Sequence, residues 1–378
     1  MDHVLARFAD LGTKSSKVSS DMKKVLRQRV EDRLDFEQVD YELVSNTYAR
    51  IICEGVSDSE EAAEYIAELP GVASASPAVK TDCSIEHIRE VVDEFEVGET
   101  FGVNANSVKE DLGSQEIERK IGSHVLDNSS SEVDLDDPDT EIFIDVRKQD
   151  TFIYTKKFGG AHGFPVGAND SLAALISGGL DSPVAAYEVM KKGSDIVPIY
   201  FYNKPVAAED HLIRFLAVIE KLKRINPAKD WKTFIVDMEE INEELLENIG
   251  TGRMIIHRRI MFKVAEHIAE EEGLKGIVTG ESMGQKSSQT PSNLELTSEA
   301  VKKPVHRPLL AENKHEIVEK SKNLGTFEEA KIDSACETLA PDSPATKMSE
   351  NKIRKIEDEI NVEELVEKAV ENIELKEV

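Results

Sequence analysis

Residues 171–187 read Ser-Leu-Ala-Ala-Leu-Ile-Ser-Gly-Gly-Leu-Asp-Ser-Pro-Val-Ala-Ala-Tyr, and the order of the rest of the chain follows outward from them. Leu172–Ile176 form an unbroken apolar run, which is typical of a short strand buried on both faces. Ser177–Gly179 follow as a turn whose glycines let the backbone approach a ligand closely. Ser182 is predicted to cap a helix and Pro183 to occupy its first position. A strand, a glycine turn and a helix start together aim backbone N–H groups at an anion, so the stretch predicts a phosphate-binding loop.

The alternative is an ordinary strand–turn–helix connection that happens to carry glycines. Asp181 favours the interpretation as a phosphate-binding loop, because an acidic side chain inside such a turn is unfavourable unless a cation lies beside it. We therefore predict that Asp181 acts in catalysis and binds Mg²⁺ through pyrophosphate oxygens. No Gly-Lys-Ser/Thr follows, which excludes a Walker loop. Ser177–Ser182 instead resembles the pyrophosphate loop (PP-loop) of ATP pyrophosphatases, which implies cleavage of ATP between its α and β phosphates.

Strands and helices alternate from Asn169 onward, which indicates a doubly wound parallel α/β sheet. The predicted strands are Leu172–Ile176, Ile196–Tyr202, Thr233–Asp237 and Gly276–Thr279, and the predicted helices are Ser182–Lys192, Glu209–Arg224, Ile255–Glu272 and Asn313–Asn323. Ligands of such folds lie outside the carboxyl ends of the strands. Four loops are therefore predicted to meet in one site, namely 177–182, 200–204, 237–254 and 279–291.

The N-terminal 82 residues follow a βαββαβ order, which is that of a ferredoxin-like α+β domain. The predicted elements are a strand Val4–Phe8, a helix Ser19–Leu34, strands 41–44 and 49–53 around a turn at 45–47, a helix capped by Asp58 and a strand Val72–Val79.

Residues 83–167 form a second predicted unit that ends in a glycine-rich linker, 159–167. The predicted elements are a helix Ile85–Phe95, a strand Phe101–Ala105, a helix capped by Ser114 and a hairpin of strands 141–147 and 151–156. Phe101–Asn106, Ser114–Arg119 and the hairpin running into Gly159 resemble a THUMP domain, an RNA-binding module of tRNA-modifying enzymes. The candidate phosphate contacts are Lys109, Arg119, Lys120, Lys156 and Lys157, with solvated surface lysines as an equal alternative.

Three further segments of the C-terminal half carry candidate ligand contacts. Tyr200 and Phe201 lie at the end of a predicted strand. The two alternatives for this aromatic pair are stacking on an adenine and packing in the core. Arg258 opens a long helix, where it neutralises phosphate or is a surface charge. Lys302 and Lys303 are basic residues in an acidic chain, and they hold either a phosphate backbone or a salt bridge at the rim.

The order of these motifs closely resembles the tRNA 4-thiouridine synthetase (tRNA sulfurtransferase) family over residues 1 to about 350. The motifs are Ser-Gly-Gly-Leu-Asp-Ser at 177–182, Thr-Gly-Glu-Ser-Met-Gly-Gln at 279–285, Ser-Ser-Gln-Thr at 287–290, Arg-Pro-Leu at 307–309 and Lys-His-Glu-Ile at 314–317. The resemblance implies that ATP is contacted by Leu175, Ile176, Tyr200, Phe201, Arg258, Gly280 and Gln289. It implies that the pyrophosphate is held by Ser177, Gly178, Gly179, Asp181 and Ser182. The implied reaction is ATP-dependent thiolation of uridine 8 in tRNA.

Cys336 matches the position of the catalytic cysteine of this family, although a free cysteine is more often a buried apolar residue. Residues 349–378 are predicted to form an acidic helical tail, which leaves no room for the rhodanese domain of many bacterial relatives. The CxxC pair of some archaeal relatives is absent from the sequence, so no iron–sulfur site is expected. The sulfur donor therefore stays open between a persulfide on Cys336, free sulfide and a sulfur-carrier protein. A part in thiamine biosynthesis is a weaker expectation.

The amino-acid composition bears on the binding partners, the cysteine chemistry and the cellular location that we expect. The 378 residues include 74 acidic and 46 basic side chains, a net charge of −28, which fits a high-salt cytosol and argues against an extended basic surface for nucleic acid. Three widely separated cysteines indicate neither a disulfide framework nor a zinc site. With no signal peptide or long apolar span, we expect a cytoplasmic protein, and the family resemblance implies a homodimer.

We therefore predict a ferredoxin-like domain at 1–82, a THUMP domain at 83–167, a PP-loop domain at 168–348 and the tail at 349–378. Two alternatives remain at this point. One is another PP-loop enzyme that adenylates RNA or a small molecule, and the other is a non-catalytic RNA-binding protein.

Overall fold

The computed structural model describes the whole chain except residues 10–14, 48–49, 206–208, 228–229, 332–338 and 342–344. It contains two compact units, Met1–Pro165 and Val166–Val378, and each is considered by itself. The finer division of the chain into four domains stays a prediction. Within the described residues, no helix combines the length and the apolar character needed to cross a membrane.

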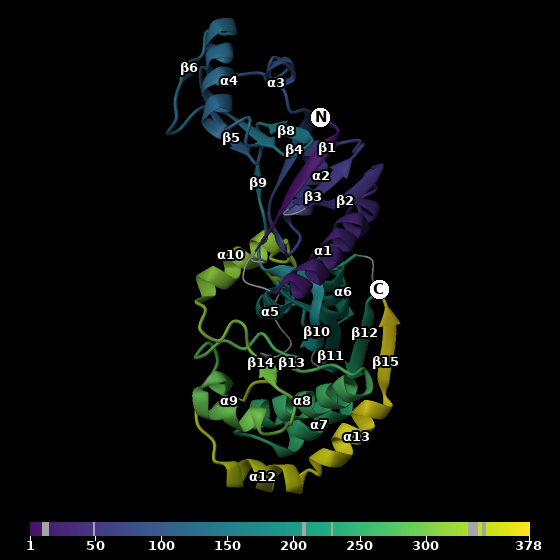
Figure 1. The fold of residues 1–378 in the computed structure, drawn as a ribbon. Helices are drawn as coiled ribbons and strands as arrows, with labels where there is room; N and C mark the ends of the chain where they lie inside the picture. Colours follow the sequence, from purple (N-terminus) through teal and green to yellow (C-terminus); the bar gives the residue numbers. More distant parts are fainter. Residues whose placement is uncertain (10–14, 48–49, 206–208, 228–229, 332–338, 342–344) are drawn as a thin grey trace. The chain divides into compact units, whose positions relative to one another are not determined.

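The first unit is built on one nine-stranded sheet with the order β2-β3-β1-β4-β8-β7-β5-β6, in which β9 also pairs with β4 (Figure 1). The elements of its first half are β1 (His3–Phe8), α1 (Ser16–Phe36), β2 (Leu43–Thr47), β3 (Arg50–Glu54), α2 (Ser59–Ala67) and β4 (Val72–Asp82). The predicted βαββαβ order is present. Asp58 caps α2 by accepting a hydrogen bond from the Glu61 N–H at 3.0 Å, as predicted. The predicted turn at 45–47 is wrong, because these residues continue β2 and Thr47 pairs with Arg50.

The second half of this sheet joins the first through β4, which pairs with β1 at one end and with β8 at the other. Its elements are α3 (Ile85–Val92), β5 (Thr100–Ser107), α4 (Ser114–Asn128), β6 (Glu132–Val133), β7 (Thr140–Val146), β8 (Asp150–Tyr154) and β9 (Phe158–Gly159). Gly113 rather than Ser114 is the N-cap of α4. The predicted linker at 159–167 contains the boundary between the two units, but part of it is strand, since β9 pairs with β4 and β10 begins at Phe164.

The second unit is a six-stranded sheet with the order β14-β13-β10-β11-β12-β15. Its elements are β10 (Phe164–Leu175), α5 (Asp181–Met190), β11 (Lys192–Tyr202), α6 (Glu209–Lys223), β12 (Lys232–Asp237), α7 (Glu239–Asn248), α8 (Arg253–Glu271), β13 (Ile277–Val278), α9 (Pro291–Ser298), β14 (Val305–His306), α10 (Lys314–Leu324), α12 (Glu350–Glu359), α13 (Val362–Glu371) and β15 (Ile373–Glu377). The pairs β10–β13, β13–β14 and β11–β12 are parallel. From β10 the chain advances to β11 and β12 on one side and returns to β13 and β14 on the other, which is the doubly wound arrangement.

Helices cover both faces of this sheet, and β10 supplies side chains to both cores. Leu172, Ala174 and Ile176 pack with residues of α5, α6 and α10, whereas Ala173 and Leu175 pack with residues of α7, α8 and α9. Alternate strand residues point to opposite faces, so an all-apolar strand is what a sheet covered on both sides requires.

The last thirty residues belong to this unit and are not a purely helical tail. Ile353 of α12 and Leu365 of α13 are buried in the core that contains α8. The chain then forms β15, which pairs antiparallel with β12 at the edge of the sheet (Figure 1). The expectation of an acidic helical tail was wrong at its end, because Ile373–Glu377 form a strand.

Candidate ATP site

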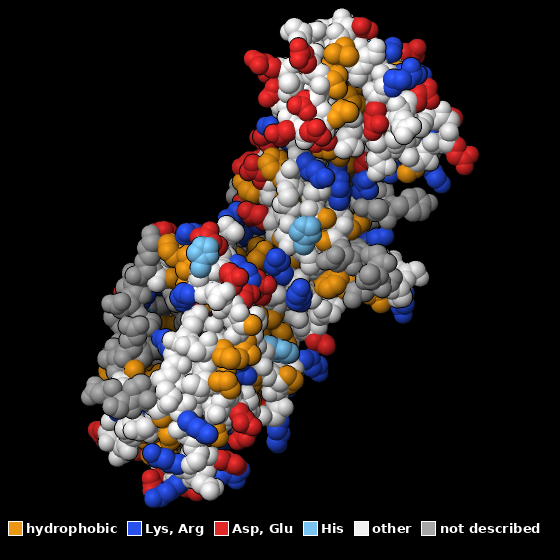
Figure 2. Space-filling view, turned by 90° about the vertical axis from the view of Figure 1, so that its left-hand side faces the viewer, with side chains coloured by type: hydrophobic (Ala, Val, Ile, Leu, Met, Phe, Trp, Pro, Cys, Tyr) orange, Lys and Arg blue, Asp and Glu red, His pale blue; other side chains and the backbone are white. Residues whose placement is uncertain are grey.

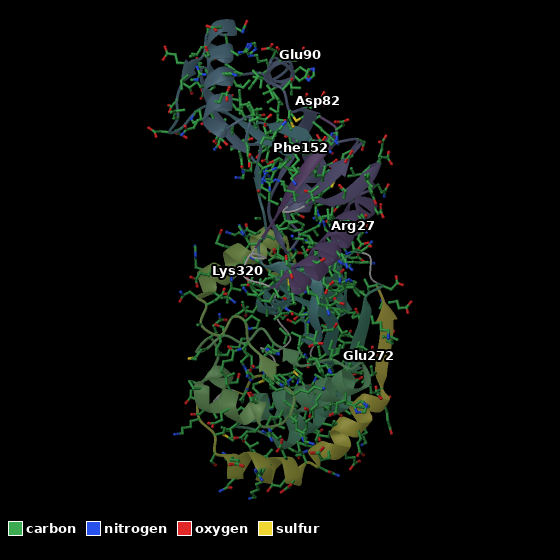
Figure 3. All side chains as sticks on the ribbon, viewed as in Figure 1. Arg27, Asp82, Glu90, Phe152, Glu272 and Lys320 are labelled. Atoms are coloured by element: carbon green, nitrogen blue, oxygen red, sulfur yellow. The ribbon has the colours of Figure 1, made fainter. Side chains whose placement is uncertain are left out.

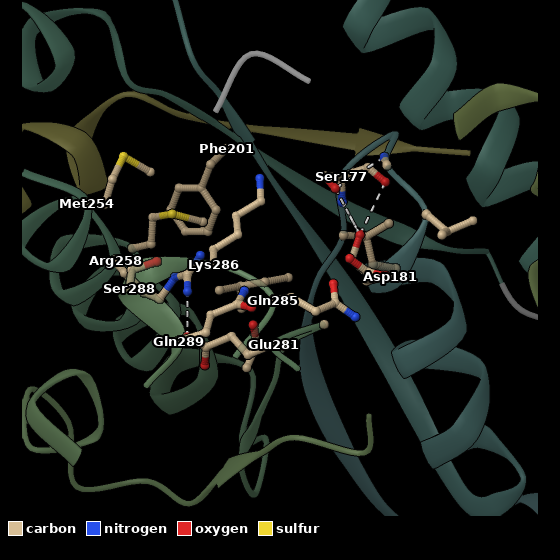
Figure 4. Close-up of a pocket in the computed structure, with 18 of the residues that line it drawn as sticks. Ser177, Asp181, Phe201, Met254, Arg258, Glu281, Gln285, Lys286, Ser288 and Gln289 are labelled. Carbon is tan, nitrogen blue, oxygen red and sulfur yellow. Dashed lines mark hydrogen bonds and ion pairs between the residues drawn. The ribbon is translucent and has the colours of Figure 1, made fainter. Parts of the chain in front are cut away.

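A cavity of about 690 Å³ lies at the carboxyl ends of β10, β11 and β13, where the order of the sheet reverses. This is the position at which open α/β sheets bind their ligands. Ten of the twelve residues predicted to contact ATP or pyrophosphate line it, namely Leu175, Ile176, Ser177, Gly179, Asp181, Ser182, Phe201, Arg258, Gly280 and Gln289. Figure 4 shows Ser177 and Asp181 on one wall and Phe201, Met254 and Arg258 on the other.

The glycine loop is held closed by its two serines. The Ser177 N–H donates to Ser182 Oγ at 2.8 Å, the two hydroxyls lie 3.0 Å apart, and the Gly179 N–H donates to Ser177 Oγ at 3.2 Å. The prediction that Ser182 caps the helix was wrong. Helix α5 begins at Asp181, and its N-cap residue Leu180 makes no side-chain capping bond. The N-terminal amides of α5 therefore carry no capping side chain, which leaves this helix end suited to an anion.

Asp181 faces a cation from another helix. Its Oδ1 accepts from Lys314 Nζ at 2.8 Å, and Lys314 is the first residue of α10. Lys320, labelled in Figure 3, ties α10 to α5 by contacting Glu188 at 2.9 Å and Glu312 at 2.6 Å. The clamp between the two helices fixes a carboxylate and an ammonium group side by side at the mouth of the glycine loop.

Asp181 fits the predicted role in Mg²⁺ binding. Within the described residues there is no cluster of three or more His, Cys, Asp or Glu side chains that would hold a metal by itself. Protein-bound Mg²⁺ commonly takes one or two carboxylates plus substrate phosphates and waters, so a single carboxylate beside a phosphate loop matches that chemistry.

The opposite wall contains a buried carboxylate between two arginines. Glu281 is 1% exposed, and its Oε1 accepts from Arg258 Nη1 at 2.6 Å while its Oε2 accepts from Arg307 Nε at 2.7 Å. Arg258 comes from α8 and lines the cavity. Two cations and one anion leave this wall with a net positive charge, which favours a phosphate-bearing ligand.

Gln289 and Phe201 provide the groups suited to a base. Gln289 is 7% exposed, and within the described part of the chain its Oε1 is buried without a hydrogen-bond donor. An unpaired buried amide oxygen is costly, so a ligand N–H group at this position would satisfy it. Phe201 supplies an aromatic surface at the end of β11.

Two of the predicted contacts do not line the cavity. Tyr200 is buried on the other face of the sheet, where its ring stacks on Phe215 with centroids 4.5 Å apart. Neighbouring strand residues point to opposite faces, so Tyr200 and Phe201 do not share one ligand. Gly178 turns toward α6, because a Cβ atom added to it would lie 3.1 Å from Arg214 Cβ.

A buried polar network reaches the cavity through Asn203, which lines it. His257 Nε2 lies 3.0 Å from Asn203 Oδ1, and the Asn242 side-chain amide donates to the Lys204 carbonyl at 2.8 Å and approaches Asn203 Oδ1 at 3.4 Å. Burial, with a smaller contribution from the Arg258 charge, lowers the pKa of His257 to about 4. The ring is therefore neutral at pH 7, and we assign the proton to Nε2, which donates to Asn203.

The remaining predicted residues fall into three groups. Cys336 falls outside the described residues, so its predicted catalytic role stays a prediction. Lys109, Arg119, Lys120, Lys156 and Lys157 belong to the first unit. Lys302 and Lys303 donate their backbone N–H groups to Glu266 at 2.7 and 2.8 Å, and Lys303 Nζ donates to the Leu274 carbonyl. These contacts favour a structural role for the 302–303 pair.

Sequence reasoning missed several residues of the site. Lys314 stands in the quoted Lys-His-Glu-Ile motif, and Glu281 stands in the quoted Thr-Gly-Glu motif, but neither was assigned a role. Met254 and Lys286 line the cavity without a motif of their own, and only the folded arrangement reveals them.

Comparison with known proteins gives a consistent family. Residues 167–362 match the family model described as "Thiamine biosynthesis protein (ThiI)", and residues 86–156 match the THUMP domain. A "Probable tRNA sulfurtransferase" from Halobacterium salinarum is 35% identical over 354 residues, covering 91% of this chain and 90% of the relative. Another from Bacillus pumilus is 33% identical, covering 99% of this chain and 95% of the relative.

A solved structure described as "Crystal structure of a 4-thiouridine synthetase - RNA complex with bound ATP" matches with a TM-score of 0.88 and 26% identity, covering 100% of this chain and 99% of that one. The fold and the glycine loop thus define a PP-loop nucleotide-binding domain on a chain that also carries a THUMP domain. The chain belongs to the tRNA sulfurtransferase (ThiI) family.

Proposed function

We propose that this protein is an ATP-dependent tRNA sulfurtransferase that converts uridine 8 of tRNA to 4-thiouridine. The observation that carries the proposal is the convergence of Ser177–Ser182, Arg258 and Gln289 on one cavity at the switch point of the sheet. Membership of the tRNA sulfurtransferase family and the 4-thiouridine synthetase match support the choice of reaction.

In the proposed first half-reaction, the C4 oxygen of the uracil attacks the α-phosphate of ATP. The bond between the α-phosphorus and the bridging oxygen breaks, and pyrophosphate leaves. The amides of the glycine loop and the N-terminus of α5 stabilise the pyrophosphate charge, and Arg258 adds a fixed cation from the other wall. Asp181 would hold Mg²⁺, which neutralises phosphate charge when bound.

Lys314 and Gln289 take supporting roles in this proposal. Lys314 pairs with Asp181 in the structure; with Mg²⁺ held at Asp181, the Lys314 ammonium group would be available to a phosphate oxygen. Gln289 Oε1 accepts a hydrogen bond from the exocyclic amino group of adenine, the donor that the buried oxygen otherwise lacks within the described residues.

In the second half-reaction, sulfide attacks C4 of the adenylated base, the C4–O bond breaks, and AMP leaves with that oxygen. A persulfide on Cys336 is the alternative sulfur source. Delivery by a sulfur-carrier protein and a homodimeric assembly also stay proposals that rest on the family.

The proposal is tested by incubating tRNA with the full chain, ATP, Mg²⁺ and sulfide, and by analysing the digested nucleosides by mass spectrometry. We expect 4-thiouridine at position 8 only when ATP is present. ATP turnover that is independent of tRNA, with no thiolated nucleoside, would instead favour a PP-loop enzyme that acts on a small molecule.

A further inference from the structure

We propose that Glu281 is a positioning residue for ATP, which acts by fixing the Arg258 guanidinium in the wall of the cavity. The inference rests on the proposed ATP site. It adds a role for a residue that lines the cavity but has both carboxylate oxygens bonded to arginines.

The first argument is that both Glu281 oxygens are already bonded. Oε1 accepts from Arg258 at 2.6 Å and Oε2 accepts from Arg307 at 2.7 Å, and the side chain is 1% exposed. A carboxylate whose two oxygens are occupied by guanidinium groups is poorly suited to bind a metal or to abstract a proton. Its remaining effect is on the arginines.

The second argument is that Arg307 anchors the carboxylate from behind. The Arg307 Nη2 group lies 3.5 Å from the Leu294 carbonyl and 3.4 Å from Thr297 Oγ1, both on α9. The Arg307 guanidinium also lies over the Phe262 ring, 6.0 Å from its centroid. Glu281 thus transmits a fixed position from α9 to Arg258, as Figure 4 shows for the Glu281–Arg258 contact.

The third argument concerns the conformational freedom of the Arg258 side chain and the charge of the cavity wall. An arginine side chain on a cavity wall has many rotamers, and a ligand that binds it must restrict them. Because Glu281 restricts Arg258 before ATP arrives, the loss of entropy on binding is reduced. The two arginines outweigh the single carboxylate, so the wall keeps its positive charge while it is held in place.

A double-mutant cycle tests the proposal through the dissociation constant of Mg·ATP, measured by calorimetry on the full chain without tRNA. We expect Glu281→Gln to weaken Mg·ATP binding about tenfold, and less than about twofold when Arg258 is already alanine. Glu281→Asp should recover part of the affinity, since it restores the charge. Equal losses in both backgrounds would show that Glu281 acts independently of Arg258 and would overturn the proposal.

A matched control lies one residue further along α8. Arg259 pairs with Glu357 at 2.6 Å, and this pair lies away from the ATP cavity. Glu357→Gln removes the same kind of charge and should change thermal stability but leave ATP affinity within about twofold of wild type.

If Glu281→Gln does not fold, Arg307→Lys provides the second variant. It should cause a smaller loss of ATP affinity, and this loss should again depend on the presence of Arg258. Unaltered affinity in Arg307→Lys would then contradict the proposal. Absence of thiolation by the wild-type protein would refute the proposed function without changing this readout.

Discussion

At the scale of single residues, Asp181 is the side chain that distinguishes a phosphate-binding loop from an ordinary turn. It is partly exposed, lies at the first position of α5 and pairs with Lys314 across the mouth of the glycine loop. The Asp181→Asn substitution keeps the shape but removes the charge that would hold Mg²⁺. We expect tRNA-dependent pyrophosphate release to fall by at least about 100-fold, because charge stabilisation at the leaving group is lost.

The control for this prediction is Asp170→Asn, because Asp170 is exposed and lies on β10 away from the cavity. Its pyrophosphate release should match that of the wild type. Full activity of Asp181→Asn would show that the carboxylate has no part in the chemistry and that the metal assignment is wrong.

His257 gives a second residue-scale prediction, because its folded pKa of about 4 lies below the ordinary value of 6.5. The unfolded chain takes up a proton as pH falls below 6.5, whereas the folded chain resists protonation until pH is near 4. The contribution of neutral His257 to the free energy of unfolding is therefore complete above about pH 6.5 and is lost progressively as pH falls toward 4. The whole contribution is about 3 kcal/mol.

The measurement is urea unfolding of the wild type and of His257→Gln at about pH 7.5 and about pH 5, at constant salt. Glutamine can donate to Asn203 without titrating, so the variant should lose less stability between the two pH values. His267→Gln, at a partly exposed position of α8, should behave like the wild type. Equal losses in His257→Gln and wild type would contradict a neutral buried histidine.

At the scale of elements, the loop after β13 is packed directly against the start of α5. A Cβ atom added to Gly280 would lie 2.7 Å from the Ser182 backbone nitrogen and 2.8 Å from the Asp181 carbonyl carbon. Backbone atoms cannot move aside as a flexible side chain does. We expect Gly280→Ala to cost about 1–3 kcal/mol in stability and to weaken ATP binding by spreading the two loops apart.

Gly250→Ala is the comparison for Gly280, since no atom lies within 4 Å of a Cβ atom added at Gly250. Thermal unfolding with and without Mg·ATP measures both effects at once. If Gly280→Ala and Gly250→Ala bind ATP equally well, the close approach of the two loops is not required by the site.

Elements that sequence reasoning placed correctly have strong local signals, and those it missed have weak ones. The run Leu172–Ile176 and the glycine turn after it have few alternatives, so the strand and the loop were predicted. The sequence alone does not reveal helix α7 inside a predicted loop, because Ile241 and Leu245 are the only apolar residues on its buried face, among many glutamates. The strand Ile373–Glu377 could not be predicted, because its pairing depends on the exposed edge of β12, far away in the sequence.

Contacts between residues far apart in the sequence were also beyond prediction at the candidate site. Residues next to glycine turns and strand ends could be predicted, because their position follows from the order of elements. The contact of Lys314 with Asp181 joins residues 133 positions apart, and no periodic pattern encodes it. The sequence alone groups Tyr200 with Phe201 because both end one strand, whereas the alternation of side chains directs only Phe201 into the cavity.

At the scale of the whole molecule, a chain with a net charge of −28 must bind a polyanion. In Figure 2, acidic side chains crowd the end of the first unit that holds α4 and β6, while lysine and arginine gather below it, at the level of β4 and β8. Lys120 already pairs with Glu116 at 2.6 Å, and Lys156 already pairs with Glu60. Within the described part of the chain, Lys109, Arg119 and Lys157 form no side-chain ion pair, and Lys157 lies over the Phe143 ring.

This difference predicts which lysines contribute to the salt dependence of tRNA binding. A cation that contacts phosphate releases counterions, so each lost contact should reduce the slope of log K against log salt by about one unit. A lysine that must first leave a carboxylate contributes less. We therefore expect Lys109→Ala and Lys157→Ala to reduce the slope by about one unit each, and Lys120→Ala to change it by less than about half a unit. Equilibrium binding of tRNA across a salt series checks this, and the opposite ranking would mean that tRNA displaces the Glu116 pair and that the predicted contacts lie along α4.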